Sequence, residues 1–244
     1  LACTVAELVL RLARHDSGVT HTDLAQLLPK EALAGSAPPD AAVRLDATPS
    51  ADAAQLDFLA PAQREIVTAL VATVENRDPF TAGHQRHVSE IAVAIGRQMG
   101  LSADQLNALC VAGLLHDIGK ISIPGEILRK PGALTATELA LVKTHSSAGY
   151  DILKSIPFPW PVAQIVLQHH EREDGSGYPF GLMGEDLLPE ARILAVADVV
   201  EAASSQRAYR PSSGLDTALA AVARDAGTCF QAEVVSACLA VFRP

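Results

Sequence analysis

Histidine and aspartate side chains recur in five short segments between residues 84 and 198. In chain order they are His84, His116-Asp117, His145, His169-His170 and Asp198. Iron, manganese and zinc accept neutral imidazole together with carboxylate better than magnesium or calcium does. One ion cannot use all seven groups, whereas two ions about 3.5–4 Å apart could share them. The segments therefore predict a binuclear metal centre.

Asp117 and Lys120 indicate what such a centre would do. A carboxylate bridging two ions would leave a hydroxide between them, placed as the nucleophile for an in-line attack on phosphorus. Lys120 follows His116 by four residues and Asp117 by three, so a helical turn would bring its ammonium to the same site, where it suits a phosphate oxygen. A His-Asp dipeptide alone is common and usually lies on a surface. The ordered set is far more specific.

Several of these polar residues interrupt apolar segments. His116 and Asp117 follow the apolar run 109–115, and Asp198 lies inside the run 193–200. An unpaired carboxylate there would cost several kcal/mol or be forced neutral. A single histidine on an apolar helix face is usually a hydrogen-bonded core residue. A structural bundle without ions is the least favoured interpretation of the whole set, because it leaves both aspartates uncompensated.

The elements that must position these residues are helices. Apolar residues recur at helical spacing from residue 52 onward, and Thr135 with Glu138 forms a capping box. Strand-like alternation occurs only around residues 120–123. The pattern predicts an all-α bundle with ligands pointing inward from several helices. The expected helices cover 52–75, 81–99, 103–116, 136–154, 161–170, 190–205, 215–226 and 232–242.

The chain divides near residue 53. Residues 1–34 suggest two short helices, and residues 35–53 are rich in alanine and proline, which is typical of a linker. We interpret 1–53 as a small N-terminal helical appendage with a linker, of unknown function, and 54–244 as the catalytic domain.

Composition narrows the class of protein. The 244 residues carry 19 basic and 28 acidic side chains, a net charge of −9, so we expect no general surface for long nucleic acid. The four cysteines have no metal-like spacing and are expected to be reduced thiols. No apolar run reaches the roughly 20 residues that span a bilayer, and no leader pattern is present. We expect a cytoplasmic domain without a membrane span.

Residues from about 55 to 244 resemble the HD-GYP domain, a bacterial signalling branch of the HD phosphohydrolase superfamily that hydrolyses cyclic di-GMP. The resemblance extends along the whole domain and includes the Gly177-Tyr178-Pro179 sequence that gives the family its name. The matching segments are 75–84, 115–124, 128–132, His145, 169–172, 174–179, 191–198 and 207–210.

The resemblance implies a ligand set. One ion would be held by His84, His116, Asp117 and Asp198, and a second by Asp117, His145, His169 and His170. Members with a third ion have a glutamate where this chain has Phe80, so a two-metal centre is implied, with iron as the first expectation and manganese as the alternative. The family's dinucleotide-contacting basic pair falls on Arg207 and Arg210. Without the resemblance, both would be interpreted as solvated helix-end arginines, although guanidinium groups match phosphate oxygens well.

The segment 174–179 has two interpretations. Its composition is that of an ordinary tight turn. Beside His169 and His170, however, Gly177, Tyr178 and Pro179 would form one wall of the substrate groove, and Asp174 would orient a histidine ligand. Family members also use this loop to contact diguanylate cyclase domains.

Three further positions bear on the same site. Glu171 and Arg172 would either support the ligands or form a surface ion pair. His87 stands where the family usually has arginine, so a supporting ion pair is expected to be missing.

The leading hypothesis is a metal-dependent phosphodiesterase. It would open cyclic di-GMP to pGpG and continue to GMP, with Asp117 and Lys120 as catalytic residues and Lys120, Arg207 and Arg210 binding the dinucleotide. The alternatives are a phosphodiesterase for another cyclic dinucleotide, such as cyclic GMP-AMP, and a non-catalytic receptor or interaction module for a cyclase domain. A homodimer is expected for a signalling domain of this kind.

Overall fold

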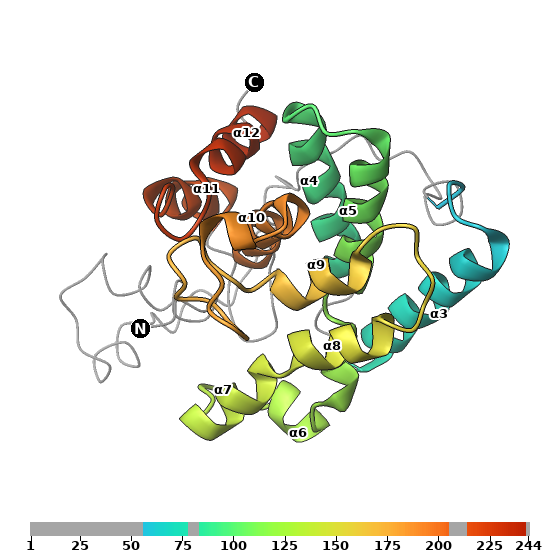
Figure 1. Cartoon of the computed structure of the whole chain (residues 1–244). Coiled ribbons are helices and arrows are strands. Elements are labelled where there is room, and N and C mark those ends of the chain that lie inside the picture. Colours follow the sequence, from blue (N-terminus) through green and yellow to red (C-terminus); the bar gives the residue numbers. More distant parts are fainter. Residues whose placement is uncertain (1–55, 78–82, 205–213, 243–244) are drawn as a thin grey trace, which may run out of the picture.

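The computed structural model describes residues 56–77, 83–204 and 214–242, which form helices joined by short connections (Figure 1). Within these ranges there is no strand, only two isolated bridges, so the predicted all-α class is confirmed. The α-helices are α3 (Pro61–Arg77), α4 (His84–Gln98), α5 (Ala103–Leu115), α6 (Gly125–Leu128), α7 (Ala136–Lys143), α8 (His145–Leu153), α9 (Val162–Gln168), α10 (Pro189–Ser204), α11 (Leu215–Arg224) and α12 (Ala232–Phe242), with 3-10 helices η2 (Ile118–Ser122) and η3 (Gly184–Asp186).

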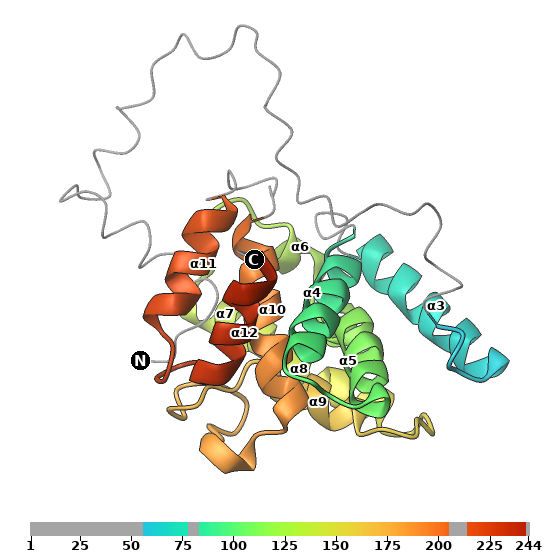
Figure 2. The same ribbon diagram turned by 90° about the horizontal axis from the view of Figure 1, so that it is seen from above.

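Helix α10 forms the centre of the bundle. It is buried from Glu190 to Ala203 with the exception of Arg192. Helices α4, α5, α9, α11 and α12 pack around it (Figures 1 and 2). A helix that is apolar on nearly every face must be enclosed in this way. Its one aspartate, Asp198, is thereby carried into the interior.

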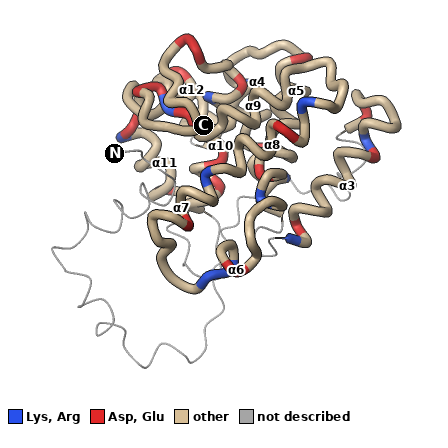
Figure 3. Tube along the Cα trace, turned by 60° about the horizontal axis from the view of Figure 1, so that its bottom comes forward, with Lys and Arg blue, Asp and Glu red and all other residues tan. Residues whose placement is uncertain are grey.

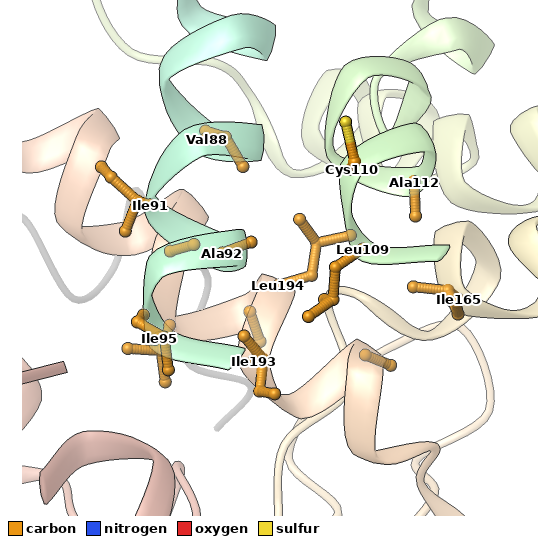
Figure 4. Close-up of a cluster of buried hydrophobic side chains, with 14 of the residues drawn as sticks. Val88, Ile91, Ala92, Ile95, Leu109, Cys110, Ala112, Ile165, Ile193 and Leu194 are labelled. Carbon is orange, nitrogen blue, oxygen red and sulfur yellow. The ribbon is translucent and has the colours of Figure 1, made fainter. Parts of the chain in front are cut away.

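The core between α4, α5, α9 and α10 fixes the helices that carry the site. Fully burying one of its larger aliphatic side chains contributes about 1.5–3 kcal/mol. Figure 4 shows Val88, Ile91, Ala92 and Ile95 of α4 together with Leu109, Cys110 and Ala112 of α5, Ile165 of α9, and Ile193 and Leu194 of α10.

Gly119 allows η2 to lie against α8. A Cβ at this position would be 1.9 Å from the His145 carbonyl oxygen and 2.6 Å from the Gly149 amide nitrogen. Atoms cannot approach so closely, so the contact exists only because residue 119 has no side chain. The turn after His116-Asp117 is thereby joined directly to the helix that begins at His145.

The observed helices differ from the predicted ones mainly in two places. Helix α3 begins at Pro61, a residue favoured at the first helical position, rather than near residue 52. The expected helix 136–154 is divided into α7 and α8. The Thr144 amide and hydroxyl both donate to the Leu141 carbonyl, at 3.1 and 2.7 Å, and this tighter turn ends α7. The segment around residues 120–123 lies largely in η2.

The predicted appendage, residues 1–53, lies outside the described residues. In the described ranges, basic and acidic residues are scattered over many elements and no long basic stretch is present (Figure 3). None of the helices in these ranges is long and apolar enough to cross a bilayer.

Candidate metal centre

All seven predicted ligand residues lie together in the interior, none more than 9% exposed. Six of them lie at helix ends and the seventh lies within α10. The chain assembles them because four helices begin or end at one place beside α10. His84 begins α4, His116 and Asp117 follow α5, His145 begins α8, His169 and His170 follow α9, and Asp198 lies within α10.

Backbone carbonyls orient three of the imidazoles. In each case the ring Nδ1 lies close to the carbonyl oxygen of the third residue before it. A carbonyl oxygen only accepts hydrogen bonds, so each Nδ1 carries the proton and each neutral ring presents a lone pair at Nε2. The distances are 2.7 Å for His116 and Gly113, 2.8 Å for His145 and Val142, and 2.6 Å for His169 and Val166.

These Nε2 atoms lack proton donors. His116 Nε2 is buried and has no hydrogen-bond partner among the described residues. The Nε2 atoms of His145 and His169 face each other at 3.4 Å. Two lone pairs at this distance repel each other unless a cation lies beside them. Divalent cations satisfy such a set of imidazole and carboxylate donors, so the residues fit metal ions.

Asp117 lies between two groups of ligand atoms. The first group is His84, His116 and Asp117 itself, and the second is His145, His169 and His170. Within each group the candidate ligand atoms are no more than 4.8 Å apart. Asp117 Oδ2 faces the first group, 3.5 Å from His116 Nε2, whereas Oδ1 lies 3.6 Å from His145 Nε2 in the second. A carboxylate with this placement can bridge two ions.

At Asp117 and in the second group, the surroundings favour the protonation states that metal ligands require. Burial lowers the pKa of His145, and burial together with neighbouring imidazoles lowers the pKa of His169 to about 3 and the pKa of His170 well below its usual value. Burial alone would raise the pKa of Asp117, but Lys120 and the nearby histidines outweigh it and hold that pKa well below the usual range. Neutral imidazoles and an ionised carboxylate result.

Glu201 is a buried carboxylate at this site that the sequence analysis missed. His84 Nδ1 donates to Glu201 Oε2, while His84 Nε2 lies 3.4 Å from Asp198 Oδ1. Burial alone would lower the pKa of His84, but these two carboxylates raise it to about 9. Glu201 follows Asp198 by three residues in the same apolar helix, so the signal that identified Asp198 could also have found it.

His87 supplies a second imidazole partner for Glu201. Its Nδ1 lies 3.8 Å from Glu201 Oε1, and the hydrogen bond to this carboxylate raises the pKa of His87. Glu201 therefore has a basic side chain beside it even though residue 87 is histidine rather than the family's usual arginine.

Lys120 lies at the junction of the two ligand groups. Its Nζ donates to Asp117 Oδ2 at 2.7 Å, and the side chain is only 15% exposed. The ammonium is thus close enough to donate to an anion bound beside Asp117 by the candidate ions. Arg207 and Arg210, the predicted dinucleotide contacts, lie outside the described residues.

The loop that contains Tyr178 folds back on the histidine pair. The Tyr178 ring stacks on His170, with centroids 4.7 Å apart. Its amide donates to the His170 carbonyl at 3.2 Å. Gly177 permits this approach, because a Cβ there would lie 2.4 Å from Glu171 Cα. Gly177, Tyr178 and Pro179 therefore lie beside the second ligand group.

Glu171 fastens this loop rather than forming a surface ion pair. Its carboxylate accepts from the amides of Phe180 at 2.7 Å and Leu182 at 3.1 Å. Arg172 is also buried; its guanidinium donates to the Glu171 carbonyl oxygen at 2.8 Å and lies over the Phe230 ring.

Asp174 does not occupy the position expected for it. Its carboxylate accepts from the Ser176 amide at 3.0 Å and from the Cys229 thiol at 3.9 Å, and no hydrogen bond joins it to a histidine in the described residues. The physical reason is that its side chain folds over its own turn. Carbonyl oxygens and Glu201 orient the histidines instead.

Comparison with known proteins identifies the family and several relatives of this chain. The family model for the HD domain matches residues 69–234, more than half of the chain. The chain is 41% identical to the Xanthomonas campestris protein named cyclic di-GMP phosphodiesterase response regulator RpfG, over 72% of this chain and 47% of that protein. It is 38% identical to 3'3'-cGAMP-specific phosphodiesterase 3 of Vibrio cholerae, over 70% of this chain and 37% of that protein.

A solved structure shares the fold. The crystal structure of a cyclic GMP-AMP specific phosphodiesterase from Vibrio cholerae matches with a TM-score of 0.57 at 20% identity, over 74% of this chain and 49% of that chain. The chain thus spans about half the length, or less, of these three relatives.

Proposed function

The chain belongs to the HD domain family, and we propose on this basis that it is a metal-dependent phosphodiesterase that hydrolyses cyclic di-GMP to pGpG, with GMP as the product of a second cleavage. The observation that carries this proposal is the Asp117 carboxylate between two groups of buried imidazoles. Relatives named for the hydrolysis of cyclic dinucleotides support the substrate class. We assign the activity to residues 54–244.

Two ions complete the site in this proposal, with iron preferred and manganese as the alternative, because both accept mixed imidazole and carboxylate ligands. When bound, they lower the pKa of a water for attack on phosphorus and offset the charge that develops. His84, His116, Asp117 and Asp198 would hold one ion, and Asp117, His145, His169 and His170 the other.

The remaining groups act on the dinucleotide. The Lys120 ammonium, 2.7 Å from Asp117 Oδ2, donates a charge-assisted hydrogen bond to an oxygen of the phosphate undergoing attack. The Tyr178 ring closes the site beside His170 and limits access of bulk water. Arg207 and Arg210 hold the second half of the dinucleotide.

Cyclic GMP-AMP is the second candidate substrate. A relative that is 38% identical is named as specific for 3'3'-cGAMP, and the same ligand set serves either phosphodiester. Base choice depends on the groove around the bases. The two substrates should therefore be compared at equal concentration in every assay.

We also propose that the segment around Gly177-Tyr178-Pro179 contacts a protein partner, a diguanylate cyclase domain, and that the chain forms a homodimer. Phe180 and Met183 next to this loop are 67% and 56% exposed, which supports a docking role. Phe180→Ser should weaken capture of a purified cyclase domain. Light scattering tests the dimer.

The decisive experiment is product analysis after anaerobic loading with iron or manganese. We expect pGpG from the parent chain and none from Asp117→Asn. Asp186→Asn, which changes an exposed aspartate in η3, is the matched control and should retain activity. Two bound ions and tight nucleotide binding without turnover by either metal form would overturn the proposal in favour of a non-catalytic receptor.

A further inference from the structure

Lys143 brings a second ammonium to the Tyr178 ring beside the candidate site. It is the last residue of α7, two positions before His145, and its Nζ lies 5.2 Å from the centroid of the Tyr178 ring. The same ring stacks on His170. The Tyr178 ring therefore links Lys143 to the second ligand group.

The backbone around Lys143 is fixed by its neighbours. The preceding carbonyl, that of Val142, accepts from His145 Nδ1 at 2.8 Å. The Lys143 carbonyl accepts from the hydroxyl of buried Ser146 at 3.2 Å. The residue therefore cannot shift without disturbing a ligand. The half-buried side chain is directed to Tyr178 rather than free to sample the surface.

The charge on Lys143 has no carboxylate partner within the described part of the chain. The other three lysines there are paired, Lys120 with Asp117, Lys130 with Glu138 and Lys154 with Asp151. An ammonium held only against an aromatic face keeps its N–H donors available for an anion. Beside a site for phosphodiesters, that anion is most simply a phosphate.

We propose that Lys143 binds the phosphate of the cyclic dinucleotide that is not being cleaved, with the Tyr178 ring as its support. A cyclic dinucleotide carries two phosphates, and Lys120 at Asp117 serves the one under attack. The inference rests on the proposed function and extends it to a second phosphate subsite. A structural account, in which Lys143 only packs on Tyr178 to hold the loop, predicts different measurements.

The test compares Lys143→Met with Lys143→Arg, using Lys154→Met as the matched control. Lys154 also lies over a tyrosine ring, 5.6 Å from the centroid of Tyr150, but at an exposed position. Each variant is assayed with cyclic di-GMP and with bis(p-nitrophenyl) phosphate, which has a single phosphate. Bound metal is measured in each preparation.

We expect Lys143→Met to raise the KM for cyclic di-GMP about tenfold relative to the KM for bis(p-nitrophenyl) phosphate, as for the loss of one charged hydrogen bond. The kcat should change little, Lys143→Arg should recover most of the affinity, and Lys154→Met should match the parent. Equal losses on both substrates, a loss of bound metal, or an unchanged KM would overturn the inference.

Failure of the proposed function is distinguishable from failure of this inference. If the parent chain does not turn over cyclic di-GMP, equilibrium binding of that nucleotide to metal-loaded protein decides the role of Lys143. Weaker binding by Lys143→Met than by Lys154→Met sustains the second subsite. Equal binding by the two variants, or no binding by the parent chain, refutes it.

Discussion

The two ligand groups differ in that only the first contains an imidazole oriented by a carboxylate, His84. In the first group, His84 donates to the buried Glu201 carboxylate and lies 3.4 Å from Asp198, and its pKa rises to about 9. In the second group, His145 and His169 donate to backbone carbonyls, and burial lowers the pKa of both. In the first group, His84 thus depends on the Glu201 side chain, although His116 there donates to a backbone carbonyl. In the second group, His145 and His169 both depend on the helix backbone.

This difference predicts unequal sensitivity to mutation. One substitution of Glu201 removes the carboxylate that accepts from His84 Nδ1. A backbone carbonyl, in contrast, remains after almost any substitution. The first group also holds a proton that an arriving ion must displace, while the neutral imidazoles of the second group bind an ion without this competition. The second group should therefore be the more robust half.

The largest effect is expected from removing one ligand of either group. His84→Ala and His169→Ala should each bind one ion instead of two. Because an ion provides several kcal/mol of transition-state stabilisation, turnover should fall about a thousandfold. Elemental analysis and product formation measure both quantities. Gln164→Ala, exposed on α9, is the control. Two ions bound to either histidine variant would contradict the division into groups.

A smaller effect is expected from separating the groups. Gly119→Ala places a Cβ 1.9 Å from the His145 carbonyl oxygen and should destabilise the protein by about 3 kcal/mol. Urea unfolding of the metal-free protein measures this change. Ser122→Ala changes an exposed residue of the same short helix and should have little effect. Equal stability of both variants would show that η2 can move from α8 without cost.

The third prediction separates the two kinds of acceptor. Glu201→Leu should weaken binding of the first ion about 10- to 100-fold and leave the second ion unaffected. Glu201→Gln should lose less affinity, because its amide oxygen still accepts from His84 Nδ1. Calorimetric titration with manganese resolves the two sites, with Glu233→Gln on the exposed face of α12 as control. Equal weakening of both ions would remove the contrast between the groups.

The smallest effect concerns α7, whose Val142 carbonyl orients His145. Thr135 caps this helix by accepting from the Glu138 amide at 3.3 Å, and Thr135→Ala should weaken the helix by about 1 kcal/mol. Hydrogen exchange in α7 should rise while two ions remain bound. Thr137→Ala, an exposed substitution inside the same helix, should not accelerate exchange. Loss of an ion from the Thr135 variant would show that His145 depends on the cap.

Several of the candidate ligand positions were predictable from the residues alone because they interrupt an apolar pattern, whereas the complete set came from the resemblance to the HD-GYP domain. His116-Asp117 ends the run 109–115, and Asp198 interrupts the apolar run 193–200. Helical periodicity likewise predicted the all-α class. The break at Thr144 was not predictable, since it depends on one hydroxyl donating to the Leu141 carbonyl within a sequence that is helical on both sides.

Other features of the site depend on tertiary contacts that no local pattern reveals. The sequence suggested Asp174 as a partner for a histidine, but its side chain satisfies its own turn. Glu171 contacts amides nine and eleven residues away, and Lys143 contacts a ring 35 positions farther along the chain. These relations require knowledge of how the loop folds back. Glu201 alone could have been found from its spacing to Asp198.

The bonds from histidine Nδ1 to the carbonyls three residues earlier have a consequence for assembly. Carbonyl groups in the last turn of a helix lack partners within that helix. His116, His145 and His169 satisfy such carbonyls at the ends of α5, α7 and α9. The same hydrogen bond therefore satisfies the helix end and orients the imidazole that follows it. Because the helix ends themselves hold these three rings, an ion that binds here would spend little binding energy on ordering them.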